Sequence, residues 1–149
     1  MEQLKHLRKL RSLHASDLRI SDAGLGSLQA LQGLSNLELC VTQVTDAGLA
    51  RIGVLRNLTR LLLNDTSVGD EGLRHLQTLS KLEHLCLVRT QVTDKGLAHL
   101  AALPKLSRLE LHGTAVTPAG VAALHAALPD CDISGADAGD RPPGTRANR

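Results

Sequence analysis

The sequence of 149 residues contains no phenylalanine, tyrosine or tryptophan, although 42% of its residues are hydrophobic. A core without aromatic rings has to be built almost entirely from leucine, valine, isoleucine and alanine. An irregular globular core usually needs a few large rings to fill it. A core of identical stacked layers does not, because one side-chain size fits every layer. The absence of aromatic residues therefore favours a repetitive architecture.

The sequence also has a small net charge and no long apolar run. The formal net charge of +2 is too small to indicate a nucleic acid or an anionic membrane as a partner. No apolar run approaches the length of a transmembrane helix, and the first residues lack the apolar stretch of a signal peptide. We therefore expect a cytoplasmic protein. The three cysteines, Cys40, Cys86 and Cys131, are an odd number without C-x-x-C spacing, so we expect free thiols.

Several residue types recur at a fixed step of twenty-four residues, which is the signature of a repeat protein. The unit reads L-x-x-L-x-L-x-x-T-x-V-T-D-x-G-L-x-x-L-x-x-L-x-x and occurs five times. Coincident columns of this kind do not arise by chance. The column at the first position of the unit is Leu10, Leu34, Leu58, Leu82 and Leu106, and the column at the fifteenth is Gly24, Gly48, Gly72, Gly96 and Gly120.

The two halves of each unit have different hydrophobic periods. The first half alternates apolar residues by two, which predicts a strand, and the second half spaces them by three, which predicts one face of a short helix. Thr45, Thr93 and Thr117 occupy the expected N-cap position of three helices, each followed by an acid or a proline, as first helical turns favour. Gly69 takes this position in the third unit, so we expect a weaker cap there.

A strand and a short helix cannot bury their apolar edges alone, but stacking the units solves this. The sequence thus predicts a solenoid in which parallel strands line a concave face and helices line the convex face. In four units a threonine stands at the same position shortly after the strand, where its hydroxyl can bond the backbone of the turn. We interpret this column as structural: Thr42, Thr66, Thr90 and Thr114, with Leu18 in the first unit.

The L-x-x-L-x-L-x-x-T strand and the T-D-x-G-L-x-x-L helix resemble the leucine-rich-repeat family over roughly residues 4–133. They are similar to the subclass of many bacterial repeat proteins and to the cysteine-containing repeats of F-box proteins. The resemblance implies an α/β horseshoe segment that binds proteins through its concave sheet. We expect a partial N-terminal repeat or cap at 1–9, five repeats with a closing segment at 10–133, in which Ile133 covers the last layer, and a disordered tail at 134–149.

The variable positions of the units collect on the strand side, whereas the core columns hardly vary. The last three units carry the most distinctive groups, with an apolar centre and a polar rim, which is a common arrangement of partner sites. A generic solvated sheet is the alternative interpretation. The candidate partner-binding residues are Arg60, Leu62, Asn64, Asp65, His84, Cys86, Arg89, Arg108, Glu110 and His112.

Some of these residues are also typical of metal or catalytic sites. His84, Cys86, Glu110 and His112 are metal-ligand types, but a zinc site needs four converging donors. Same-row side chains on neighbouring strands are expected to point in parallel, and no ligand-spacing motif supports a site. A Cys86–His pair lacks an evident oxyanion hole. We therefore predict no metal, no cofactor and no enzyme activity.

Three functions remain open from the sequence. The first is a protein-binding module that acts as a monomer. The second is the substrate-recognition region of a larger protein such as an F-box-like ubiquitin-ligase adaptor, although only nine residues precede the first unit. The third is self-assembly through an open N-terminal end, where an exposed edge strand can recruit another chain. Charged residues near that edge, Arg11, Asp17 and Arg19, argue against the third.

Overall fold

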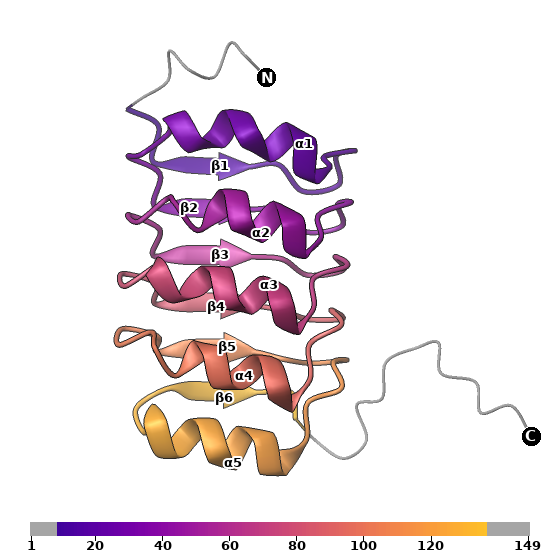
Figure 1. The fold of residues 1–149 in the computed structure, drawn as a ribbon, viewed down its shortest axis with the longest axis vertical. Helices are drawn as coiled ribbons and strands as arrows, with labels where there is room; N and C mark the ends of the chain where they lie inside the picture. Colours follow the sequence, from indigo (N-terminus) through magenta and orange to yellow (C-terminus); the bar gives the residue numbers. More distant parts are fainter. Residues whose placement is uncertain (1–8, 137–149) are drawn as a thin grey trace, which may run out of the picture.

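The computed structural model of the chain describes residues 9–136 as one stack of strand-and-helix units (Figure 1). All strands run in parallel and pair in chain order. Each strand residue pairs with the residue twenty-four positions later on the next strand, as Arg60 does with His84. The strands are β1 (Ser12–His14), β2 (Asn36–Glu38), β3 (Arg60–Leu62), β4 (His84–Cys86), β5 (Arg108–Glu110) and β6 (Asp132–Ser134).

Helices cover one side of this sheet, at the positions that the threefold apolar spacing predicts (Figure 1). In two units the helix is completed by a 3₁₀ segment, whose three residues per turn align side chains three apart. Leu73 lies in the helix before such a segment, Leu76 in the segment and Leu79 directly after it, and all three are fully buried. The helical elements are α1 (Asp22–Leu25), η2 (Gly26–Ala30), α2 (Asp46–Ile52), α3 (Asp70–Arg74), η3 (His75–Thr78), α4 (Asp94–Leu100) and α5 (Pro118–Ala127).

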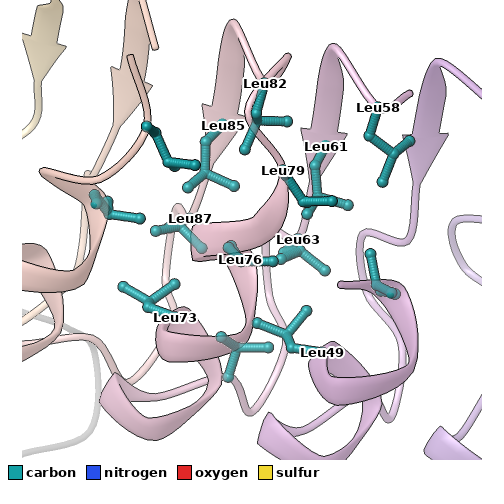
Figure 2. Close-up of a cluster of buried hydrophobic side chains, with 14 of the residues drawn as sticks. Leu49, Leu58, Leu61, Leu63, Leu73, Leu76, Leu79, Leu82, Leu85 and Leu87 are labelled. Atoms are coloured by element: carbon teal, nitrogen blue, oxygen red, sulfur yellow. The ribbon is translucent and has the colours of Figure 1, made fainter. Parts of the chain in front are cut away.

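The core is a column of leucine layers between the sheet and the helices (Figure 2). Leu61 and Leu63 enter it from β3 and the turn that follows, and Leu73 enters from α3; none has any exposed surface. Burial of one such side chain stabilises the fold by about 1.5–3 kcal/mol. The core contains no aromatic ring, in agreement with the sequence prediction that identical layers replace large side chains.

The threonine column is the structural ladder that the sequence predicts. Thr66, Thr90 and Thr114 are buried, and each hydroxyl donates to the carbonyl oxygen three residues earlier at 2.7 Å. Thr42 makes the same bond. In the first unit Leu18 has no hydroxyl, and 54% of its surface is exposed.

A second ladder, which the sequence analysis did not predict, joins the start of each helix to the next unit. Asp70 accepts two hydrogen bonds from Thr93, from the backbone N–H at 2.8 Å and from the hydroxyl at 2.7 Å. A Cβ atom on Gly96 would lie only 2.4 Å from Oδ1 of Asp70. The glycine column therefore makes room for the carboxylate of the preceding unit. The same arrangement joins Asp22 to Thr45 and Gly48, and Asp94 to Thr117 and Gly120.

The predicted N-caps are confirmed. The hydroxyls of Thr45 and Thr93 accept from the backbone two residues later at 3.3 Å, and that of Thr117 accepts from Gly120 at 3.2 Å. Gly69 offers no side-chain cap to α3, and only its backbone N–H donates to Asp46, at 2.7 Å.

The C-terminal end differs from the sequence expectation in one respect. Ile133 packs against the core as part of β6, in agreement with the expectation that it covers the last layer. The boundary expected at residue 134 falls inside this strand, where Ser134 pairs with Glu110. Residues 1–8 and 137–149, which hold most of the expected N-terminal repeat and tail, lie outside the described residues.

Replacing Gly69 by threonine should stabilise the protein. The backbone at Gly69 is extended, with φ −126° and ψ −162°, and its nearest neighbour to an added Cβ is Oδ2 of Asp46 at 3.5 Å. Gly69→Thr adds the missing cap and restricts the unfolded chain, so the free energy of unfolding should rise by about 0.5–1 kcal/mol. Urea denaturation of this variant and of Gly69→Ala, which adds no hydroxyl, separates the two effects. Equal stability of both variants would contradict a capping role.

Candidate binding surface

The outward side of the sheet carries the candidate residues. In β2–β5 the middle residue, such as Leu61 or Leu85, is fully buried in the core. The flanking residues lie on the opposite face, where Arg60 and Arg108 are exposed and Leu62 is half-buried. We call the outward residues of β2–β5, together with the turns that follow these strands, the strand face. The placement of the variable rows on this face agrees with the sequence prediction.

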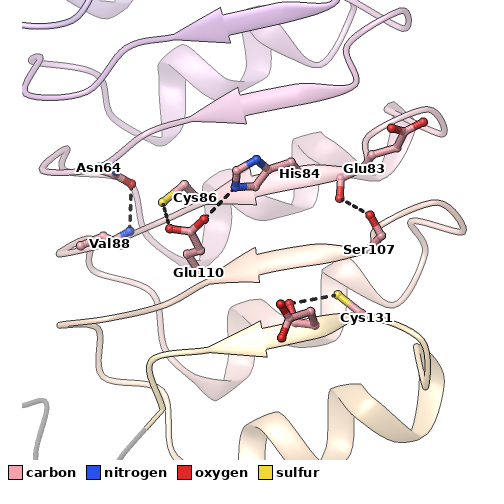
Figure 3. Close-up of polar contacts among 9 residues, drawn as sticks. Asn64, Glu83, His84, Cys86, Val88, Ser107, Glu110 and Cys131 are labelled. Carbon is pink, nitrogen blue, oxygen red and sulfur yellow. Dashed lines mark hydrogen bonds and ion pairs between the residues drawn. The ribbon is translucent and has the colours of Figure 1, made fainter.

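Three predicted residues converge on one carboxylate in the strand face (Figure 3). Oε1 of Glu110 lies 2.9 Å from Nε2 of His84, and Oε2 accepts a hydrogen bond from Sγ of Cys86 at 3.2 Å. The expectation that neighbouring side chains only point in parallel is therefore wrong here. It failed because the glutamate side chain on β5 is long enough to reach across to both residues of β4.

Burial and hydrogen bonding fix the protonation of this cluster. Burial, together with the hydrogen bond to Glu110, raises the pKa of the Cys86 thiol to about 11, and only 2% of the residue is exposed. Although burial opposes the charge of Glu110, hydrogen bonds from Cys86 and His84 hold its pKa below the ordinary value. At neutral pH the cluster thus contains a neutral thiol that donates and a charged carboxylate that accepts.

This arrangement is unlike a catalytic or metal centre. A thiol with a pKa of about 11 has little nucleophilic thiolate at neutral pH. Both oxygens of Glu110 are engaged by protein groups. Within residues 9–136, no group of three or more histidine, cysteine, aspartate or glutamate side chains is arranged to hold a metal ion.

The turns after β1–β5 each contain a residue in the left-handed conformation, at the eighth position of the unit. Asp65 and Arg89 occupy it in the third and fourth units with φ near +55°, and their side chains form a two-bond ion pair with both separations at 2.5 Å. The hydrogen bonds from Arg89 lower the pKa of Asp65. Gly113 occupies the position in the fifth unit. This constraint was not predicted from the sequence, although the glycine in the column was a signal for it.

The structure divides the ten candidate residues into groups. His84, Cys86 and Glu110 form the cluster, Asp65 and Arg89 form the ion pair, and Asn64 accepts the backbone N–H of Val88 at 3.2 Å. The backbone N–H groups of Arg60 and Arg108 donate to Ser35 and Glu83, whereas their side chains make no hydrogen bond or ion pair with another residue that the structure describes. Arg60 and the half-buried Leu62 lie on the same face of β3. His112 lies apart from the cluster, beside Gly135 and a hollow at the C-terminal end of the stack.

No protein-family model and no curated protein matches the sequence. Solved structures match the fold. An internalin of Listeria monocytogenes superimposes with a TM-score of 0.76 at 23% identity over 100% of this chain and 38% of its own. Internalin C2 of the same organism gives 0.76 at 24% identity over 90% and 55%. The fold is a leucine-rich-repeat solenoid.

A leucine-rich-repeat protein of Leptospira interrogans also matches, with a TM-score of 0.58 at 20% identity over 89% of this chain and 38% of its own. The chain thus spans 38–55% of these leucine-rich-repeat proteins. The expected fold is confirmed, whereas the narrower subclass and the similarity to F-box repeats stay predictions. In the described part of this leucine-rich-repeat chain, no helix has the length and apolar character needed to cross a membrane.

The Cys86 thiol should react far more slowly with iodoacetamide than the half-buried Cys40. Its pKa of about 11 against an ordinary 9.0 makes the thiolate fraction at neutral pH about a hundredfold smaller. Mass spectrometry of two variants that each keep one of these cysteines measures both rates. Glu110→Gln should accelerate labelling of Cys86, because it removes the charge that helps to raise the pKa. Labelling of both thiols at one rate would refute the assignment.

Replacing Val41 by glycine should stabilise the fold. Val41 is a branched residue at φ +56° and is 52% exposed, so its side chain packs little. Relief of the left-handed strain in the folded state outweighs the added conformational freedom that glycine gives the unfolded chain. We therefore expect the free energy of unfolding, measured by heat or urea, to rise by about 1 kcal/mol. Arg89→Gly is the matched comparison, because it relieves the same conformation but also breaks the ion pair with Asp65. If the free energy of unfolding rises no more in Val41→Gly than in Arg89→Gly, strain at Val41 is not what limits stability.

Proposed function

We propose that this protein is an interaction module that binds a protein partner through the strand face of its last three units. The observation that carries the proposal is the contrast between the two sides of each strand. The inward residues are nearly invariant leucines, whereas the outward residues differ from unit to unit. The proposed contact residues are Arg60, Leu62, Asn64, Asp65, His84, Cys86, Arg89, Arg108 and Glu110, with His112 at the margin.

The polar network prepares this face for binding. Glu110 holds His84 and Cys86 in place, and the Asp65–Arg89 pair fixes the adjacent turn. Side chains that are already ordered lose less conformational entropy when a partner docks. Arg60, Arg108 and Leu62 then remain as groups that a partner can engage, since arginine and apolar side chains often dominate binding energies.

A second candidate function is the recognition region of a larger protein, such as a ubiquitin-ligase adaptor. Its support is that the chain matches only part of longer leucine-rich-repeat proteins. The two functions share the same binding face, so they differ in what is attached to the repeats. The full reading frame around this sequence distinguishes them. Under either function we propose that the protein itself is not an enzyme and acts without a cofactor.

Replacing three residues of the strand face should abolish partner capture. In the variant Arg60→Ala/Leu62→Ala/Arg108→Ala, crosslinking with mass spectrometry in a native lysate should lose the partner that the unmodified protein captures. The circular dichroism spectrum should not change, because none of the three side chains is part of the core. The expected loss is at least about tenfold in captured partner, as for removal of central contacts.

A matched triple variant on the helical side provides the control. Arg51→Ala/Val54→Ala/Lys95→Ala changes two charges and one exposed apolar residue as well, but it leaves the strand face intact. It should capture the partner normally. Equal capture by the strand-face variant and the unmodified protein would exclude the proposed surface.

A further inference from the structure

Charged residues are divided unequally between the two edges of the stack. The leading edge is the turn from each helix end into the first strand residue, and the trailing edge runs from the turn after each strand into the first helical turn. The leading edge has seven basic residues, Lys9, Arg11, Arg56, Arg60, Lys81, Lys105 and Arg108, against the acids Glu83, Asp130 and Asp132. The trailing edge has the reverse, Asp17, Asp22, Asp46, Asp65, Asp70, Glu71 and Asp94 against Arg19, Arg89 and Lys95.

The acidic trailing edge is explained by the fold. Four of its aspartates begin helices, where negative charge is favourable, and accept bonds from the following unit, and Asp65 pairs with Arg89. In the basic leading edge, Arg11 and Lys81 bond a neighbouring unit, through the carbonyl oxygen of Gly33 and the side chain of Asn57, both at 2.7 Å. Arg60 and Arg108 have no side-chain bond of this kind. Helix C-termini favour cations only within their last turn, and Arg60 and Arg108 are in strands. Their charge is not needed to hold the stack together.

The basic residues are concentrated at the start of β3–β5. There Arg60, His84 and Arg108 are in register on neighbouring strands, so the two arginines lie about 10 Å apart at two strand spacings. Both side chains are exposed and, within the described residues, form no hydrogen bond or ion pair, although the charge of Arg108 is felt by Glu110. The turns before these strands add Arg56, Lys81 and Lys105, with Glu83 as the acid among them.

We infer that this basic leading edge binds an acidic, extended segment of the protein partner. This rests on the proposed function, and it names the chemistry of the partner. In an extended segment of polyproline II conformation every third side chain lies on the same face, about 9 Å further along, which matches the separation of Arg60 and Arg108. Each guanidinium can hold a carboxylate through two parallel hydrogen bonds. Single-stranded nucleic acid fits less well, because the chain has no phenylalanine, tyrosine or tryptophan on which bases could stack.

Fluorescence anisotropy with a defined peptide tests the inference. The probe is a fluorescein-labelled peptide of sequence Glu-Ala-Thr-Glu-Ala-Thr-Glu, and the reference peptide has glutamine in place of every glutamate. The full chain should bind the acidic probe at least about tenfold more tightly than the reference at low salt. Arg60→Glu/Arg108→Glu should reduce the affinity for the acidic probe by at least the same factor, and added salt should weaken binding.

A charge-matched variant separates a local site from the overall charge. Arg19→Glu/Lys95→Glu changes the net charge equally but lies on the trailing edge, so it should keep the affinity of the unmodified chain. Equal loss in both double variants, or equal binding of the two peptides, would overturn the inference. Tighter binding of an oligothymidine or of phosphatidylserine vesicles than of the peptide would overturn it as well.

The outcome of the peptide-binding test can be distinguished from the outcome of the partner-capture test of the proposed function. If the acidic probe fails to bind while the triple strand-face variant still loses its partner, the strand face is a binding surface for a segment of another chemistry. If the probe binds through Arg60 and Arg108 but the lysate partner is unaffected by the triple variant, the proposed function falls and the acidic-segment site stands.

Discussion

A leucine on a strand of this protein cannot be buried by its own unit. Its side chain is enclosed between the strands before and after it and the helices that cross behind them, so every layer depends on its neighbours. That dependence requires a constant step of twenty-four residues, because a shift of one residue along a strand would turn the leucine outward. The backbone bonds of the sheet and the carboxylate ladder at the helix starts both enforce this step. Stability is thus a property of the interfaces between units.

The sequence was sufficient to predict most of this architecture. The columns located the strands, the helix starts and the threonine ladder, because each depends on a residue type at a fixed position. The pairing of Asp70 with Thr93 and Gly96 was not predicted, although all three stand in visible columns. Each had an adequate local explanation, as a first-turn acid, a cap and a small residue. Their contact across twenty-three or more residues becomes evident only when the units are stacked.

The candidate site was predictable in position but not in geometry. The alternation along the strands placed Arg60 and Leu62 on the outward face correctly. The convergence of His84 and Cys86 on Glu110 was missed, since it depends on side-chain length and direction, which a register of backbone positions does not contain. The left-handed turn was missed for a similar reason, because Val41 and Arg89 are poor indicators of positive φ.

Proline replaces aspartate at the first position of α5, and this has a consequence for how the protein can be enlarged. Pro118 offers no carboxylate, so a unit added behind α5 would find no acceptor for its own capping residue. An internal duplication behaves differently. A second copy of residues 58–81 placed between Lys81 and Leu82 would meet a suitable carboxylate on one side and supply one on the other. The stack can therefore be lengthened by inserting copies of its middle units. The fifth unit cannot be extended in this way, because Pro118 gives the next unit no carboxylate to bond.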